Sequence, residues 1–149
     1  MLKKGDSLPA INLKDQDGKS FSFSDMIGKP MVIYFYPKNN TKVCTAQACG
    51  FRDHYQDFQD AGAEVIGISR DSEESHKKVT NQRKLPFILL SDSKRQAEKA
   101  FKVPSVLFGI VPGRVTFVID KEGKVAHTFR ADFSADSHIK EALKVIRKF

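Results

Sequence analysis

The sequence has no long apolar run of the kind found in membrane and exported proteins. No stretch approaches the roughly 20 apolar residues that cross a bilayer, and Lys3 and Lys4 are not followed by the apolar segment of a secretory signal. Hydrophobic residues make up 40% and charged residues 29% of the chain, which is ordinary for a soluble globular protein. These features favour a cytoplasmic protein without a membrane partner.

Cysteine is scarce, and the two that are present, Cys44 and Cys49, do not form a C-x-x-C redox motif. Two thiols in a cytosolic chain are more often catalytic or redox-sensing than structural. A zinc site made of these cysteines and His54 is not expected on a helix, because each five-residue step turns the side chain by about 140°. We therefore expect no metal site.

Motifs of several other function classes are also absent. There is no Ser-His-Asp or paired-carboxylate pattern typical of hydrolases. Four histidines lie on different predicted elements and are interpreted as surface residues: His54, His76, His127 and His138. The formal net charge is +7, but no basic stripe alternates with aromatic residues, so the sequence does not favour nucleic-acid binding.

The sequence does contain a regular alternation of strand and helix patterns, which predicts a single α/β domain over residues 1–149. It begins with a hairpin from Ile11 to Phe23, with its turn at Asp17–Gly18. Strands are then predicted over residues 30–37, 64–69, 86–92, 115–120 and 124–129, and helices over 41–60, 72–84, 94–101 and 135–149. Prolines and glycines predict a loop over 102–114. This order fits a three-layer sandwich around a central mixed sheet.

On the helix predicted over 41–60, the two thiols face different ways. Cys44 shares a stripe with Ala48, which marks the core side of the helix. Cys49 lies about 140° further round, on the polar side with Arg52. One thiol is therefore expected to point inward and the other toward solvent.

The spacing also restricts how these thiols can bond. A five-residue step along a helix separates the Cα atoms by about 8.7 Å, whereas a disulfide needs them within about 7 Å. A bond between Cys44 and Cys49 would require the first turn or two to unwind, which suits a cycling disulfide and not a structural one. The start of a helix favours a thiolate at Cys44, and Pro37 and Thr41 are placed to shield or contact its sulfur. A fixed cation must come from elsewhere in the chain.

The residues around Cys44 and Cys49 resemble a known family. Pro37-Lys-Asn-Asn-Thr41-Lys-Val-Cys44 has the P-x-x-x-T-x-x-C pattern of peroxiredoxins. Its continuation "CTAQACGFRD" is similar to the Q-type peroxiredoxins, also called bacterioferritin-comigratory proteins. The segments "VIYFYP", "AGAEVIGIS", "LPFILLSD" and "PGRVTFVIDKEGKV" have counterparts in the same order, so the resemblance covers nearly the whole chain.

The resemblance implies a thioredoxin-like fold and a role for each site residue. Cys44 would be the peroxidatic cysteine and Cys49 the resolving cysteine. Arg114 would hold the thiolate and the peroxide, Thr41 would hydrogen-bond the peroxide, and Pro37 would cover the pocket. From the residues alone, Thr41 could equally be a helix cap and Arg114 a surface arginine at the start of a strand.

Two positions depart from the family pattern, which commonly has Pro-Gly before the peroxidatic cysteine. Here Lys42 and Val43 stand in their place. This change bears on how readily the first turn unwinds, and Lys42 adds a positive charge near Cys44. Gln47 and Arg52, further along the same helix, are interpreted as surface or packing residues.

The implied activity is a thiol-dependent peroxidase that reduces hydrogen peroxide and organic hydroperoxides to water and alcohols. Cys44 would become a sulfenic acid and then form an intramolecular disulfide with Cys49, which thioredoxin would reduce. Neither a metal nor a haem or flavin cofactor is required, and a monomer is expected because the disulfide lies within one chain. The alternatives are a redox-sensing thiol–disulfide module without significant peroxidase activity, and a binding protein with incidental cysteines.

Overall fold

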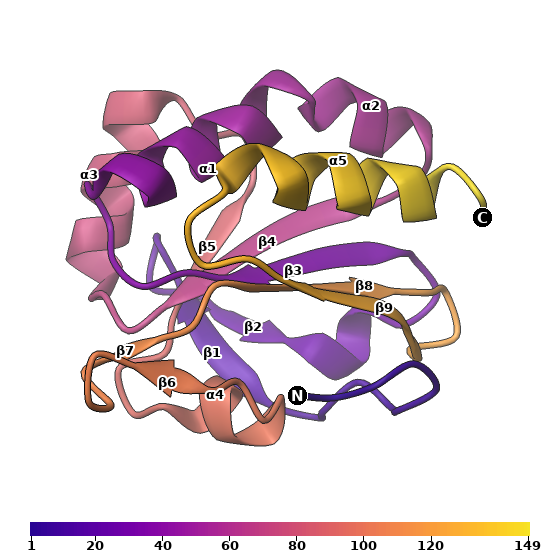
Figure 1. Ribbon diagram of the computed structural model, residues 1–149, viewed down its shortest axis with the longest axis horizontal. Coiled ribbons are helices and arrows are strands. Elements are labelled where there is room, and N and C mark those ends of the chain that lie inside the picture. Colours follow the sequence, from indigo (N-terminus) through magenta and orange to yellow (C-terminus); the bar gives the residue numbers. More distant parts are fainter.

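A computed structural model describes residues 1–149, which form one seven-stranded sheet with helices on both faces (Figure 1). The strand order is β2-β1-β5-β4-β3-β8-β9. Their bounds are β1 (Asn12–Asp15), β2 (Ser20–Ser22), β3 (Met31–Phe35), β4 (Glu64–Ser69), β5 (Ile88–Ser91), β8 (Val115–Ile119) and β9 (Val125–Arg130). β3, β4 and β5 are parallel and the other pairs are antiparallel. The predicted mixed sheet and N-terminal hairpin are therefore confirmed.

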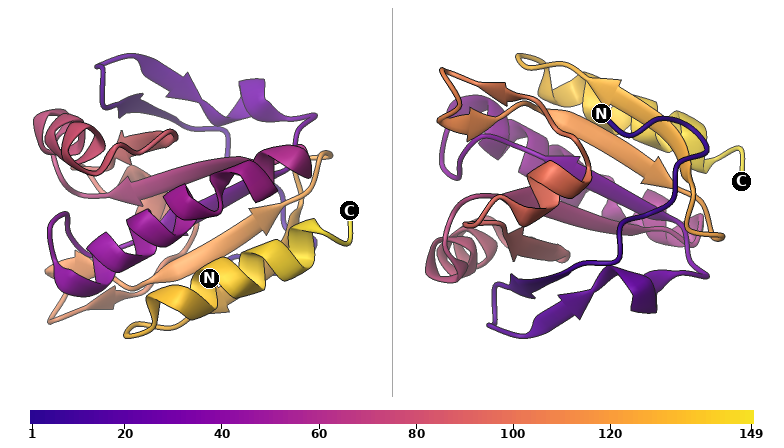
Figure 2. Two further views of the ribbon diagram at one scale, coloured as in Figure 1. Left: turned by 90° about the horizontal axis from the view of Figure 1, so that it is seen from above. Right: turned by 90° about the horizontal axis from the view of Figure 1, so that it is seen from below.

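The helices form the outer layers. They are η1 (Phe23–Met26, a 3-10 helix), α1 (Lys42–Asp53), α2 (Tyr55–Asp60), α3 (Glu73–Arg83), α4 (Gln96–Ala100) and α5 (Ala135–Ile146). α1 and α5 run side by side over one face, while α4 and the N-terminal segment cover the other (Figure 2). None of these helices combines the length and apolar character needed to cross a bilayer.

The central strand β3 is buried on both faces, which explains its continuous apolar sequence. Val32 and Tyr34 belong to a cluster of 18 buried residues beneath α1, α2, α3 and α5. Met31 and Phe35, with the opposite parity, belong to a second cluster of 17 buried residues on the other face. The period of two along one strand therefore supplies both cores, and the three-layer arrangement follows.

The single helix predicted over 41–60 is wrong in one respect, because the structure divides it into α1 and α2 at His54. His54 has φ −104° and ψ 10°, outside helical values. Phe51 and Phe58 are nevertheless both fully buried. The apolar period continues across the interruption, so the sequence pattern gives no sign of it.

The loop predicted over 102–114 also needs correction. It contains a small antiparallel sheet of β6 (Ser105–Val106) and β7 (Val111–Pro112). Two-residue strands are too short to show a period of two, and the prolines and glycines around them are typical of loops. We refer to residues 105–112 as the β6–β7 hairpin.

Candidate active site

Cys44 lies in the first turn of α1 and points into the core. Its side chain is 3% exposed, and it packs in the same cluster as Ala48. Cys49, five residues later, is half-buried, and both cysteines are free thiols within one continuous helix. The predicted difference in orientation between the two thiols agrees with this burial.

The fixed cation near the thiol is Arg114. This residue precedes β8, which pairs antiparallel with β3 so that Val115 lies opposite Phe35. The pairing brings Arg114 next to the segment that leads into α1. Its guanidinium Nη2 donates a hydrogen bond to Cys44 Sγ at 3.2 Å. Arg114 is 3% exposed, so its interpretation as a surface arginine is excluded.

Further contacts fix the direction of the Arg114 guanidinium. Nη1 donates to Gln47 Oε1 at 2.6 Å, and Nε donates to the Asp132 carbonyl oxygen at 3.1 Å. Asp132 in turn forms an ion pair with Arg130 at 3.1 Å and accepts a hydrogen bond from the Arg114 backbone N–H. Burial raises the pKa of Asp132, but the hydrogen bonds from Arg130 and Arg114 outweigh it, so the pKa lies below its usual value. Asp132 thus remains a carboxylate paired with Arg130, and its backbone carbonyl oxygen orients the Arg114 side chain.

Gln47 is a site residue that the sequence interpretation missed. Of the two roles expected for it, surface or packing, its full burial excludes the surface role, and its amide oxygen accepts a hydrogen bond from Arg114 that the sequence did not predict. Its amide Nε2 has no hydrogen-bond partner. The signal available in the sequence is its position three residues after Cys44, which places both on the same side of the helix.

A pocket of about 340 Å³ opens beside Arg114. It is lined by Pro37, Thr41, Lys42, Val43, Val106, Leu107, Val111, Arg114, Asp132 and Phe133. Cys44 is not among these residues and is linked to the pocket by its contact with Arg114. The pocket therefore presents one buried cation in mostly apolar surroundings.

Thr41 occupies the cap position of α1 but does not cap it. Its hydroxyl donates to the Lys38 carbonyl at 2.8 Å, and it makes no side-chain hydrogen bond to the helix. The first turn also contains no acidic residue. The N–H groups at this end of α1 are therefore left without a side-chain acceptor.

The loop before α1 is held from below by a buried polar network. Tyr36 Oη donates to Asn39 Oδ1 at 2.6 Å, and Asn39 N–H donates to Asp71 Oδ2 at 2.9 Å. Asn39 Nδ2 lies 3.0 Å from His76 Nδ1, while His76 Nε2 lies 3.0 Å from the Leu90 carbonyl oxygen. Because a carbonyl only accepts, the proton is assigned to Nε2, and Nδ1 accepts from Asn39.

Two histidines interpreted as surface residues are in fact buried. His76 and His138 are both fully buried. His138 contacts Thr116 Oγ1 at 2.7 Å and the Ala131 carbonyl oxygen at 2.8 Å, next to Asp132. Burial lowers the pKa of both imidazoles. They act as neutral hydrogen-bonding groups beneath the site.

Comparison with known proteins places the chain in a family. A model of the AhpC/TSA family matches residues 4–128. The peroxiredoxin Q of Sedum lineare, named chloroplastic, is 51% identical over 146 residues, which cover 98% of this chain and 78% of that protein. The chloroplastic peroxiredoxin Q of Triticum aestivum is 50% identical and covers 98% and 67%. The chain belongs to the Q-type peroxiredoxins of the AhpC/TSA family.

Solved structures agree with this assignment. The crystal structure of peroxidoxin BcpB from Mycobacterium tuberculosis has a TM-score of 0.93 and 34% identity, covering 100% of this chain and 99% of the other. The thioredoxin-like fold is therefore confirmed, and this Q-type peroxiredoxin is a thiol-dependent peroxidase. The redox-sensing and binding-protein alternatives lose their support.

These comparisons show that one expectation from the sequence, the cytoplasmic location, is wrong. The absence of an export signal favoured a cytoplasmic protein, but the curated relatives at about half identity are named chloroplastic. Composition does not distinguish a plastid stroma from a cytosol, because both require the same kind of soluble surface.

Proposed function

We propose that Cys44 is the thiol that attacks the peroxide. The observation that carries the proposal is the 3.2 Å contact between Arg114 Nη2 and Cys44 Sγ. A thiolate is the nucleophilic form of cysteine, and a neighbouring guanidinium and helix N-terminus both stabilise it. Cys44 meets both conditions, whereas Cys49 has neither a buried cation nor a place in the first turn.

The reaction then proceeds in balanced steps. The Cys44 thiolate attacks one oxygen of the peroxide, the O–O bond breaks, and the other oxygen leaves as water or an alcohol after taking a proton. Cys44 is now a sulfenic acid. Donors from Arg114 and from the start of α1 stabilise the charge that develops across the breaking bond. Thr41 and Pro37 line the pocket in which the peroxide sits.

Cys49 then attacks the sulfenic sulfur, a disulfide forms, and water leaves. The two thiols cannot meet while α1 is helical, since a five-residue step separates their Cα atoms by about 8.7 Å. The start of α1 is suited to opening because Thr41 does not cap it and Lys42 places a positive charge at the positive end of the helix dipole. The chain acts as a monomer in this cycle, and an external dithiol of the thioredoxin type reduces the disulfide.

Intact mass after one equivalent of hydrogen peroxide tests this proposal. The reduced protein should lose two hydrogens within seconds, form no covalent dimer and retain no alkylatable thiol. Cys49→Ser should stop at a Cys44 sulfenic acid, a gain of one oxygen, and Cys44→Ser should not react. Full peroxidase activity in Cys44→Ser would exclude the proposed role.

A further inference from the structure

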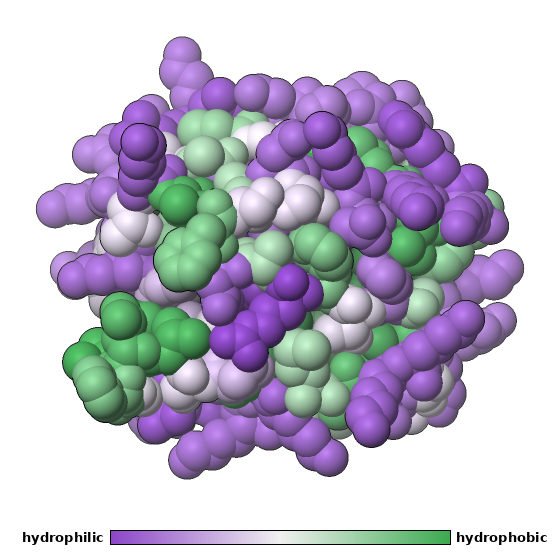
Figure 3. All heavy atoms as spheres, in the orientation of Figure 1, coloured by the Kyte–Doolittle hydropathy of each residue, from purple (hydrophilic) through white to green (hydrophobic).

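The β6–β7 hairpin forms one wall of the pocket beside Arg114, through Val106, Leu107 and Val111. Its tip buries almost nothing. Leu107, Phe108 and Ile110 are 66%, 106% and 68% exposed, and they form the green patch at the lower left of Figure 3. Burial in the core therefore does not hold the tip of this wall in place.

The backbone of the tip is itself unfavourable. Leu107, Phe108 and Gly109 have φ values of 52°, 57° and 84°. Residues other than glycine rarely adopt this left-handed region. The hairpin has only two paired positions between its strands. Such a turn keeps its shape only where the surrounding structure imposes it.

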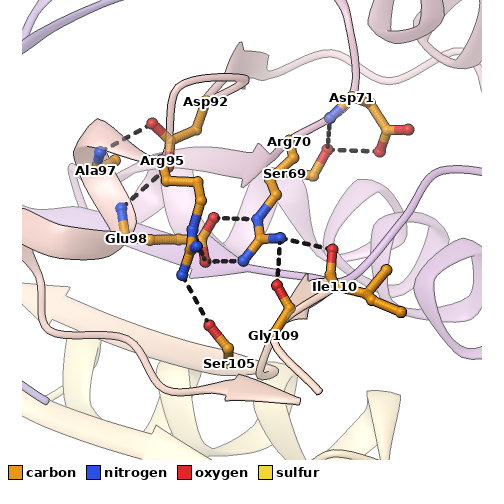
Figure 4. Close-up of polar contacts among 10 residues, drawn as sticks. All are labelled: Ser69, Arg70, Asp71, Asp92, Arg95, Ala97, Glu98, Ser105, Gly109 and Ile110. Atoms are coloured by element: carbon orange, nitrogen blue, oxygen red, sulfur yellow. Dashed lines mark hydrogen bonds and ion pairs between the residues drawn. The ribbon is translucent and has the colours of Figure 1, made fainter. Parts of the chain in front are cut away.

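Arg70 supplies that constraint. It directly follows β4, and its guanidinium reaches across to the tip of the hairpin (Figure 4). Nη1 donates to the carbonyl oxygens of Gly109 at 2.9 Å and Ile110 at 2.6 Å. These are side-chain hydrogen bonds from the sheet to the same turn that carries the strained residues.

Glu98 holds the other side of the Arg70 guanidinium. Its two carboxylate oxygens accept from Nε at 2.6 Å and from Nη2 at 2.7 Å, a two-point contact that fixes the plane of the arginine. Glu98 is 3% exposed and lies on α4. Arg95, next to α4, donates to Ser105 Oγ at 3.1 Å, at the base of the hairpin. The hairpin is thus attached to the body of the protein at its tip and at its base.

We propose that Arg70 and Glu98 form a positioning pair that sets the hairpin wall of the pocket and thereby the reactivity with organic hydroperoxides relative to hydrogen peroxide. The inference rests on the proposed role of Cys44. Hydrogen peroxide has no organic part and needs only the thiol and Arg114. An apolar substituent must pack against the pocket walls, so its binding depends on where Val106 and Leu107 are held.

The test replaces the pair with apolar side chains in the double variant Arg70→Met/Glu98→Leu. Exchange of a buried ion pair for apolar residues is often neutral for stability, whereas both carbonyl oxygens at the tip lose their donor. With dithiothreitol as reductant, kcat/KM for cumene hydroperoxide should fall roughly tenfold, as expected for lost packing in an apolar pocket. The value for hydrogen peroxide should stay within about twofold, and amide exchange over 105–112 should accelerate.

The matched control is Asp136→Leu/Lys140→Met, which removes an exposed pair on α5 and should leave the ratio of the two rate constants unchanged. An unchanged ratio in the Arg70 double variant overturns the inference, as does an equal loss with both peroxides, which is the result of a merely structural role. If the double variant does not fold, Arg70→Lys provides the test. A lysine keeps the charge beside Glu98 but cannot also donate to both carbonyl oxygens at the tip. The ratio of kcat/KM for cumene hydroperoxide to that for hydrogen peroxide must therefore still fall. A wild-type protein inactive with both peroxides would instead refute the proposed function.

Discussion

The two sides of the pocket around Arg114 are held by different kinds of interaction. On the side of α1, the loop that precedes Cys44 rests on buried hydrogen bonds, with Asn39 at their centre. On the other side, the β6–β7 hairpin leaves its apolar tip in solvent and depends on the guanidinium of Arg70. The first side lies over the core, and the second is attached to it from outside.

This difference separates two requirements of a peroxidase. The attacking sulfur must stay within hydrogen-bonding distance of its cation, and a buried network has few alternative arrangements. The wall that meets the variable part of the substrate can shift without disturbing that distance. With Cys44 as the proposed attacking thiol, we therefore expect reactivity to depend on the α1 side and selectivity on the hairpin side.

The largest effect is expected at Arg114, which both sides share. Arg114→Met removes the donor to Cys44 Sγ and should lower kcat/KM by about 10²–10³-fold, the usual cost of losing one donor to developing charge. The loss should be equal for hydrogen peroxide and cumene hydroperoxide. Arg52→Met is the control, because Arg52 lies on the outer side of α1 and bonds Asp53 and the Arg83 carbonyl oxygen. A loss confined to one peroxide would break the division of roles between the two sides.

A substitution on the α1 side should lower the free energy of unfolding, whereas a substitution at the hairpin tip should not. Asn39→Ala removes the amide that accepts from Tyr36 Oη and donates to His76 Nδ1 and leaves these two buried atoms only their 3.5 Å contact with each other. It should lower the free energy of unfolding by about 2–4 kcal/mol. Phe108→Ser, at a fully exposed position, should change it by no more than about 0.5 kcal/mol. Urea unfolding of both variants measures the contrast. Equal losses would mean that the hairpin tip is part of the core after all.

The pH dependence of stability should also come from the α1 side. Burial lowers the pKa of His76 and of His138 below the ordinary value of 6.5, so the unfolded chain takes up each proton first as the pH falls. The stabilisation that the neutral imidazoles contribute is complete above pH 6.5. It is lost as the pH drops through the pKa values of these histidines in the folded protein, by about 1.4 kcal/mol for each unit by which the pKa is lowered. Asp132 contributes in the same direction, but only below its usual pKa of 3.8.

Urea unfolding at pH 7.5 and pH 5 measures this loss. His76→Gln should reduce the difference between the two pH values. His127→Gln should not, because His127 is only part-buried, beside Glu141. A wild-type protein equally stable at both values would contradict the assignment of neutral buried imidazoles.

The comparison of the two sides also shows which features could be predicted from the sequence. Strands with period two and the stripe through Cys44 predicted the sheet and the inward thiol, since both reflect local geometry. Arg114 came only from the resemblance, because its contact with Cys44, 70 positions away, depends on the pairing of β3 with β8. No local pattern encodes that pairing.

The interpretation from the sequence failed mainly for polar residues that the fold buries. His76 lies in the polar sequence of α3, which predicts a surface residue. Gln47 is a polar residue between Ala46 and Ala48 on α1, and the sequence does not decide between a surface and a packing role. Each is buried because a distant partner satisfies it: Leu90 and Asn39 for His76, and Arg114 for Gln47. The Arg70–Glu98 pair, 28 positions apart, is hidden for the same reason. Burial of a polar group is decided by its partner, and the partner is fixed only by the fold.

The smallest expected effect concerns the opening of α1. Val43→Gly lowers helix propensity by roughly 0.4 kcal/mol, the difference between valine and glycine, and this makes unwinding of the first turn cheaper. Formation of the Cys44–Cys49 disulfide after a peroxide pulse should accelerate about twofold if unwinding limits it, as a change of roughly 0.4 kcal/mol implies. The step should be followed by quenched alkylation and intact mass. Lys144→Gly, an exposed position on α5, loses more helix propensity than Val43→Gly and should leave the rate unchanged. A rate unaffected by Val43→Gly would show that unwinding of the first turn of α1 does not limit disulfide formation.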